Sequence, residues 1–214
     1  MEFVGGRTLE SHIKKLDANP PPSGVNQQTL SIALRVTTAL QHLHERKIVH
    51  RDVKPGNIFI SDADNEQVPQ VVKLGDFGVT KWGDFRAAMT TGALTMSNQQ
   101  GLGTIKYMSA EQAIRPKDVT VRSDMYSLGI TLFELFTGRL LPSQHHAFEI
   151  RQARGMRTNI TGRLQAVDVR GLSAFEEGVF EPILDMFLSA DRRPTSKLMT
   201  GRFAYWLERL EGLL

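Results

Sequence analysis

The sequence contains no cysteine, and this absence excludes both a disulfide framework and thiolate chemistry. A small secreted domain held together by disulfide bridges is therefore excluded. We expect a cytoplasmic protein, with a nuclear location as the alternative, because reducing compartments are where proteins without disulfides are common.

An excess of charge of one sign is also lacking. The 26 basic side chains nearly balance the 23 acidic ones, which leaves a formal net charge of +3. No segment approaches the ~18 consecutive apolar residues of a membrane span. The N-terminal MEFVGGRTLE also lacks the basic start and apolar run of a signal peptide. We therefore expect neither a nucleic-acid partner nor a membrane partner.

Apolar residues are present in the proportion expected of an ordinary globular domain. They make up 41% of the 214 residues, which is enough for one sizeable core. We therefore predict a single domain.

Two helices are predicted in the N-terminal part of the chain. A proline-rich break at 19–24 separates a short helix at 9–17 from a long amphipathic helix that begins at Leu30 and ends near Arg46. The predicted buried stripe of the long helix consists of Ala33, Leu34, Thr37, Leu40 and Leu43.

Three further helices are predicted in the C-terminal half. The segment 123–137 is apolar on all sides, which indicates a helix buried around its circumference, and Gly138 should end it. Amphipathic patterns predict two more helices, near 175–188 and near 196–212.

Between these helical regions the apolar period changes. Short apolar runs at 58–60 and 71–74 flank the polar segment 62–67, which predicts two short strands joined by an extended hairpin loop. The following segment, 76–111, has no period and is too long for a passive connection. We expect it to be a functional or partly mobile loop.

Two short motifs bracket this strand pair. HRDVKPGN occupies 50–57 and DFG occupies 76–78. In this order, with a strand after the first motif and another before the second, they match the catalytic and magnesium loops of protein kinases. The chain thus resembles the large lobe of a eukaryotic-type serine/threonine protein kinase.

This resemblance implies a mainly α fold, α+β when complete, with a short β-hairpin carrying the catalytic and metal loops. The hinge segment would be 1–8 and the large lobe 9–214, with the catalytic loop at 50–57 and the activation segment at 76–111. We expect the N-terminal small lobe, which holds the glycine-rich loop and the ATP-binding lysine, to be absent from this chain.

The resemblance also assigns roles to the motif residues. Asp52 would accept the proton of the substrate hydroxyl, and Lys54 would reach the transferring phosphate and indicates a serine/threonine acceptor. Asn57 and Asp76 would bind Mg²⁺ through hard oxygen atoms. Taken singly, each acidic or amide residue could instead be a turn former.

Further roles follow from the same resemblance. Glu2 and Val4 would face the adenine of ATP from the hinge, with Phe59 beneath the ring. Thr104 would hydrogen-bond near Asp52. Arg51 would receive a phosphate from the activation loop. The candidate phosphate acceptors are Thr90, Thr91, Thr95 and Ser97.

Two structural interactions are expected as well. The segment 103–111 resembles the end of a kinase activation segment, with Ser-Ala-Glu in place of the usual Ala-Pro-Glu. Glu111 should therefore form a buried ion pair with Arg193. Asp124 should cap the start of its helix and hold the catalytic loop from beneath.

A narrower likeness points to the kinases that phosphorylate the alpha subunit of translation initiation factor two. It rests on 103–112, 127–135 and 149–154. Gln99 departs from that pattern, because a phosphorylatable threonine is usual at its position. NIMA-related kinases and mitogen-activated kinase kinases remain open.

Two functional hypotheses follow. The chain is either part of a larger active kinase, whose partners are ATP, a protein substrate and its own small lobe, or a noncatalytic kinase-like binding or scaffold fragment. We expect the 214-residue chain alone to bind magnesium-ATP weakly and to turn over little or not at all. An exposed apolar patch near Phe3 and Phe59 should promote association.

Overall fold

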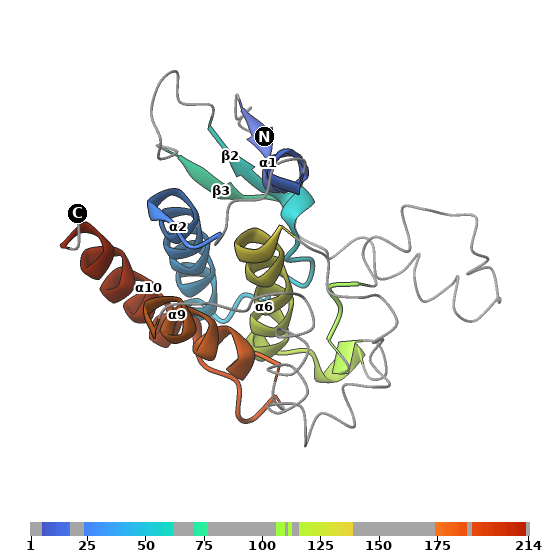
Figure 1. The fold of residues 1–214 in the computed structure, drawn as a ribbon. Coiled ribbons are helices and arrows are strands. Elements are labelled where there is room, and N and C mark those ends of the chain that lie inside the picture. The colour runs from blue at the N-terminus through green and yellow to red at the C-terminus, as the bar shows by residue number, and fades with distance from the viewer. Residues whose placement is uncertain are drawn as a thin grey trace.

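A small antiparallel sheet lies at one end of a group of packed helices in the computed structural model (Figure 1). The structure describes residues 6–17, 24–61, 71–76, 106–109, 111–112, 116–138, 174–187 and 190–212. Its elements are β1 (Arg7–Thr8), α1 (Leu9–Asp17), α2 (Gln27–Glu45), η1 (Pro55–Asn57), β2 (Ile58–Ile60), β3 (Val72–Leu74), η2 (Pro116–Asp118), α6 (Val121–Thr137), α9 (Ala174–Asp185) and α10 (Ser196–Glu211).

The predicted helices are present, and capping residues explain where α2 begins. Asn26 accepts a hydrogen bond from the backbone amide of Thr29 at 2.9 Å, and the Thr29 hydroxyl accepts one from the amide of Asn26 at 3.0 Å. This capping box satisfies free amides of the first turn. The helix therefore begins at Gln27, three residues before the predicted Leu30, because the cap and not the apolar stripe determines the start.

Helix α6 is buried around its circumference, as its composition predicts. Every residue from Ser123 to Phe136 is buried. Thr120 is the N-cap, and Gly138 ends the helix with φ of 65°. A positive φ favours glycine, so the predicted helix end is confirmed for a stereochemical reason.

The predicted hairpin is part of a three-stranded sheet in the order β1-β2-β3. Both pairings are antiparallel, with Arg7 opposite Ile60 and Ile58 opposite Leu74. Strand β1 was not predicted, because two residues are too few for a period-two pattern.

Gly6, before β1, has φ of 145°, and a Cβ there would lie 2.2 Å from the Ile60 carbonyl oxygen. Only glycine permits this approach of the two strands.

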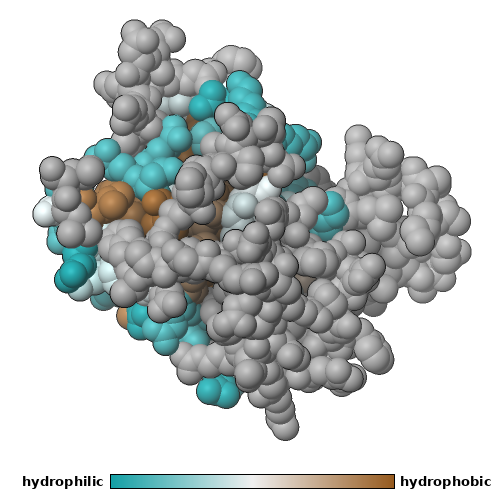
Figure 2. Space-filling model, viewed as in Figure 1, coloured by the Kyte–Doolittle hydropathy of each residue, from teal (hydrophilic) through white to brown (hydrophobic). Residues whose placement is uncertain are grey.

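The core lies between the helices. Helix α10 packs mainly against α2, and α6 contacts both α2 and α9. The Phe136 ring lies 5.9 Å from that of Phe180 and 6.5 Å from that of Phe203, so aromatic contacts join α6 to α9 and α10. On the face in Figure 2, hydrophobic surface appears beside α2 and α10. None of the helices within the described ranges is long and apolar enough to cross a membrane.

Candidate active site

A carboxylate from α6 holds the segment 50–57. Asp124 Oδ2 accepts a hydrogen bond from the His50 amide and Asp124 Oδ1 accepts one from the Arg51 amide, each at 2.8 Å. The Gln112 side chain donates to the Arg51 carbonyl at 3.0 Å. Arg51 has φ of 69°, a left-handed conformation that is unfavourable for most residues. These bonds hold the backbone in that conformation, so the predicted support from beneath is confirmed.

The capping role predicted for Asp124 is wrong. Thr120 is the N-cap of α6, and its hydroxyl accepts a hydrogen bond from the Arg122 amide at 3.2 Å. Asp124 is the fourth residue of the helix, and its carboxylate points to amides of another segment. Sequence position alone could not distinguish a carboxylate that serves its own helix from one that serves a distant loop.

Three of the predicted site residues lie together. The amide nitrogen Nδ2 of Asn57 donates to Asp52 Oδ2 at 2.9 Å and to the Asp52 carbonyl at 2.7 Å. Lys54 Nζ lies 3.0 Å from Asp52 Oδ2. Asp52 and Asn57 are buried, with 6% and 3% of their surface exposed. The ammonium group of Lys54 and the side-chain amide of Asn57 therefore both contact one oxygen atom of the Asp52 carboxylate, Oδ2.

The hairpin brings Asp76 beside this group. The Gly75 amide donates to the Asn57 carbonyl at 2.9 Å, and the Asp76 carbonyl lies 3.5 Å from Asn57 Nδ2. Asp76 has φ of 55°, so the chain turns sharply as it leaves β3. The two strands thus place residues 19 positions apart at one site.

The residues at this position fit a magnesium ion. Because Asn57 Nδ2 is bonded to Asp52, the atom of its amide that could bind a cation is Oδ1, and the exposed Asp76 side chain has carboxylate oxygens of the kind that Mg²⁺ prefers. Among the described residues, no group of three or more His, Cys, Asp or Glu side chains could hold a metal. Mg²⁺ commonly uses one or two protein oxygens together with substrate phosphates, so a two-residue site is sufficient.

His50 connects the two loops, a role that the sequence analysis did not predict. Its Nε2 lies 3.1 Å from the Gly75 carbonyl, and the Asp52 amide donates to its Nδ1 at 3.3 Å. Burial lowers the pKa of His50, although the nearby carboxylates of Asp124, Asp52 and Asp76 raise it in part. The neutral ring with a proton on Nε2 fits both bonds. The sequence feature that could have indicated this role is the position of His50 at the start of the HRD motif.

Of the other predicted site residues, the structure describes Phe59 and Arg51. Phe59 is half-buried on β2, and its ring packs against Gly75, where a Cβ would lie 2.9 Å from Cε2. Arg51 is half-buried. The predicted site residues Glu2, Val4 and Thr104, the predicted phosphate acceptors Thr90, Thr91, Thr95 and Ser97, and Phe3 of the expected apolar patch lie outside the described residues.

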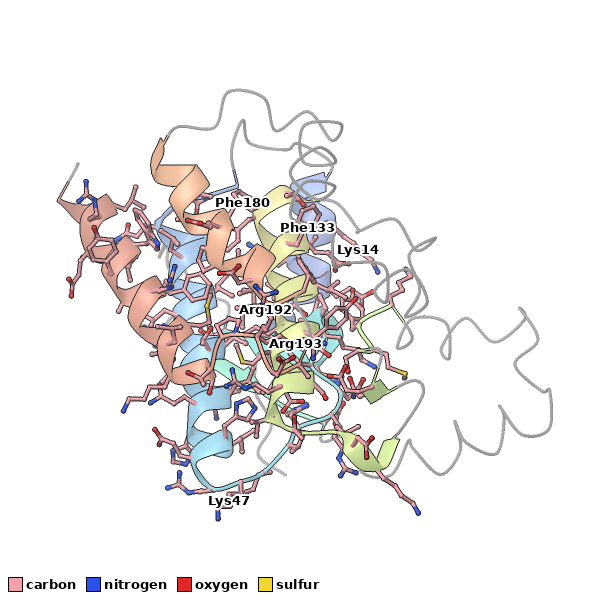
Figure 3. All side chains as sticks on the ribbon, turned by 90° about the horizontal axis from the view of Figure 1, so that it is seen from below. Lys14, Lys47, Phe133, Phe180, Arg192 and Arg193 are labelled. Carbon is pink, nitrogen blue, oxygen red and sulfur yellow. The ribbon has the colours of Figure 1, made fainter. Side chains whose placement is uncertain are left out.

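The predicted pair between Glu111 and Arg193 is confirmed. The Arg193 guanidinium makes two bonds to the Glu111 carboxylate, and the Ser123 hydroxyl donates to the same carboxylate at 2.9 Å. Arg193 also donates to the Arg122 carbonyl at 3.0 Å and lies 5.1 Å from the centre of the Tyr126 ring. Figure 3 shows Arg193 inside the molecule, beside α6. Glu111 and Arg193 are therefore bonded both to each other and to α6, through Ser123 and the Arg122 carbonyl.

Tyr107 anchors the same segment at a second point. Its hydroxyl donates to Glu134 Oε2 at 2.7 Å, and the Ser127 hydroxyl donates to its carbonyl at 2.7 Å. Burial raises the pKa of Glu134 to about 7, although the Tyr107 hydrogen bond and the charge of Lys106 oppose the shift. Neither Tyr107 nor Glu134 was predicted from the sequence, because a glutamate in an apolar helix has no visible partner there.

Replacement of Glu134 by glutamine is expected to stabilise the protein above pH 7. The carboxyl keeps its proton up to about pH 7 when folded but ionises near pH 4.5 when unfolded, so stability falls as pH rises through this interval. Glutamine can still accept the Tyr107 hydrogen bond and needs no proton. The gain in unfolding free energy should be on the order of 1–3 kcal/mol at pH 8 and near zero at pH 4.5.

The measurement is denaturant unfolding of both proteins at several pH values. Other titrating groups are common to both, so the difference between the two curves isolates position 134. A gain that does not depend on pH would contradict the ionisation argument.

The sequence is similar to those of known protein kinases. The protein kinase domain model matches residues 1–193. The chain is 39% identical over 140 residues to the serine/threonine-protein kinase PrkC of Bacillus subtilis, covering 65% of this chain and 19% of the relative. It is 40% identical over 138 residues to the serine/threonine-protein kinase PknB of Mycobacterium leprae, with 64% and 19% covered.

The family match bears out the expected resemblance to protein kinases. The matches span less than a fifth of the length of these relatives, 19% in each case. The family model covers most of the chain, including the loops that hold Asp52, Asn57 and Asp76. The chain therefore belongs to the protein kinase domain family.

Proposed function

We propose that this chain is the catalytic part of a serine/threonine protein kinase, which transfers the γ-phosphate of ATP to a hydroxyl of a protein substrate. The observation that supports this proposal is the convergence of Lys54 and Asn57 on the Asp52 carboxylate. The two relatives named above are both described as serine/threonine-protein kinases, which supports phosphate transfer to serine or threonine as the reaction.

In the proposed reaction, Asp52 orients the substrate hydroxyl and accepts its proton. The hydroxyl oxygen bonds to the γ-phosphorus as the bond from phosphorus to the bridging oxygen breaks, and ADP leaves. Lys54 Nζ, 3.0 Å from Asp52 Oδ2, places positive charge beside the transferring phosphate. The hydrogen bond from Asn57 keeps the Asp52 carboxylate in position.

Asn57 and Asp76 would hold Mg²⁺ in this site. The ion neutralises phosphate charge when it is bound. The bond from the Gly75 amide to the Asn57 carbonyl holds the backbone of Asp76, which has a left-handed conformation, close to Asn57. Phe59, on the neighbouring strand, is proposed to lie beneath adenine, and Glu2 and Val4 to bind its edge.

Replacement of Asp76 by asparagine is expected to raise the Mg²⁺ concentration needed for half-maximal ATP binding by about 10- to 100-fold. An amide provides a neutral oxygen where the ion requires a carboxylate. The measurement is calorimetric titration of ATP into the full-length protein at a series of Mg²⁺ concentrations. Asp118→Asn, an exposed residue of η2, is the matched control and should leave the dependence unchanged. Equal Mg²⁺ dependence in both variants would contradict the metal assignment.

The noncatalytic alternative makes a different prediction for the same protein. A kinase-like binding module would bind a protein partner without transferring phosphate from ATP. Incubation of the full-length protein with labelled ATP and a mixed serine/threonine peptide library distinguishes the two, because only a kinase labels the peptides. Labelling of the peptides is the result we expect.

Three narrower expectations remain predictions. The relatives named above are bacterial serine/threonine kinases, so they lend no support to a role in phosphorylating translation initiation factor two. The cytoplasmic or nuclear location rests on the absence of cysteine alone. The roles of Thr104 and Arg51 rest on the resemblance described above.

A further inference from the structure

His44, near the end of α2, links two elements that lie far apart in the sequence. Its Nε2 lies 3.0 Å from Asp124 Oδ2 on α6, and its Nδ1 lies 3.0 Å from the hydroxyl of Ser196 at the start of α10. The side chains of His44 and Asp124 are 7% and 1% exposed, and Ser196 is 4% exposed. This buried connection has no part in the proposed phosphate transfer described above.

The hydrogen bonds of Asp124 determine which nitrogen of His44 holds the proton. Asp124 Oδ2 already accepts from the His50 amide, and Oδ1 accepts from the Arg51 amide. A carboxylate accepts hydrogen bonds, so His44 Nε2 must be the donor to it. In the neutral ring Nδ1 is then an acceptor, and the Ser196 hydroxyl is placed to donate to it.

The position of Ser196 is set by the start of α10. Thr195 is the N-cap and accepts a hydrogen bond from the Leu198 amide at 3.2 Å, which makes Ser196 the first helical residue. Because α10 packs against α2, the start of α10 presents this hydroxyl to His44. The bond therefore connects two helices that pack against each other.

We propose that Ser196 is a positioning residue for the catalytic segment. Its hydroxyl holds the His44 ring in the orientation and tautomer that donate to Asp124, and Asp124 holds the two amides that precede Asp52. The packing of α10 is thereby coupled to the position of Asp52. The catalytic consequence rests on the proposed function, whereas the structural consequence can be measured without any activity.

The first test measures the structure of the full chain by NMR. In Ser196→Ala, hydrogen exchange at the His50 and Arg51 amides should become at least about tenfold faster, since their shared acceptor is less well held. The ¹⁵N signal of His44 Nδ1 should move downfield because the atom loses its donor. Thr37→Val is the matched control. Thr37 is buried on α2, the helix that also carries His44, and the substitution removes the 2.6 Å hydrogen bond from its hydroxyl to the Ala33 carbonyl.

The second test measures catalysis by the full-length protein. Ser196→Ala should lower kcat by about three- to tenfold and leave the KM for ATP unchanged, since no nucleotide contact is altered. His44→Gln keeps a donor for Asp124 but has no ring to orient. In that background Ser196→Ala should have no further effect on kcat, which is the non-additivity expected of residues that act in series.

The outcomes separate this inference from the proposed function. Exchange at His50 and Arg51 that is the same in Ser196→Ala as in Thr37→Val would overturn the inference, whatever the activity. Additive effects of Ser196→Ala and His44→Gln on kcat would also overturn it. Faster exchange in Ser196→Ala, together with a wild-type protein that transfers no phosphate, would support the coupling and overturn only the proposed function.

Discussion

Asp52→Asn is expected to lower kcat for phosphate transfer by at least about 10²-fold in the full-length protein. The carboxylate accepts the substrate proton in the proposed reaction, and a neutral amide cannot. Lys54 Nζ and Asn57 Nδ2 both converge on Asp52 Oδ2, so an amide nitrogen at this point would also face two donors. The substitution therefore removes the base and disturbs the groups that position it.

The measurement is steady-state phosphate transfer from labelled ATP to a serine/threonine substrate. Asp118→Asn makes the same chemical change at an exposed position and should retain wild-type kcat. Thermal unfolding of each variant shows whether the fold is intact. If folded Asp52→Asn keeps its activity, the assignment of Asp52 as the base is wrong.

Arg193→Ala is expected to lower the free energy of unfolding by about 3–5 kcal/mol. The substitution leaves the Glu111 carboxylate without its charged partner in a site where only 16% of that side chain is exposed. It also removes the hydrogen bond to the Arg122 carbonyl and the contact with the Tyr126 ring. Denaturant unfolding at neutral pH measures the loss.

An exposed ion pair provides the control for this prediction. Lys14 Nζ lies 3.0 Å from Glu10 Oε1, with 73% and 54% of the two side chains exposed. Lys14→Ala should cost about 0–1 kcal/mol, because water and salt screen exposed pairs. Similar losses for the two variants would contradict the role assigned to burial.

The effect of Arg193→Ala should also depend on pH. Burial alone would raise the pKa of Glu111, but the hydrogen bond and charge of Arg193 outweigh burial and lower it. A lowered pKa stabilises the folded protein above the unfolded value of 4.5, and this contribution is lost as pH falls below it. The difference between wild type and Arg193→Ala should therefore shrink in acid.

The local pattern of the sequence was sufficient for most of the fold. Apolar periodicity predicted α2, α9 and α10, the proline-rich break predicted α1, and an apolar run on all sides predicted α6. The alternation of apolar runs with a polar loop predicted β2 and β3. These features depend on neighbouring residues, so they are visible in the sequence. The start of α2 and the existence of β1 were missed, because a capping box and a two-residue strand leave almost no periodic signal.

The sequence by itself determined the identity and order of the groups at the candidate site, since the motifs that hold Asp52, Asn57 and Asp76 are short and local. The resemblance predicted that Asp124 supports the segment that precedes Asp52, but only the tertiary structure showed that Asp124 does not cap its own helix and that His44 and Ser196 meet across two helices. Hydrogen bonds between residues 74 to 152 positions apart depend on how helices pack, and no spacing along the chain encodes that arrangement.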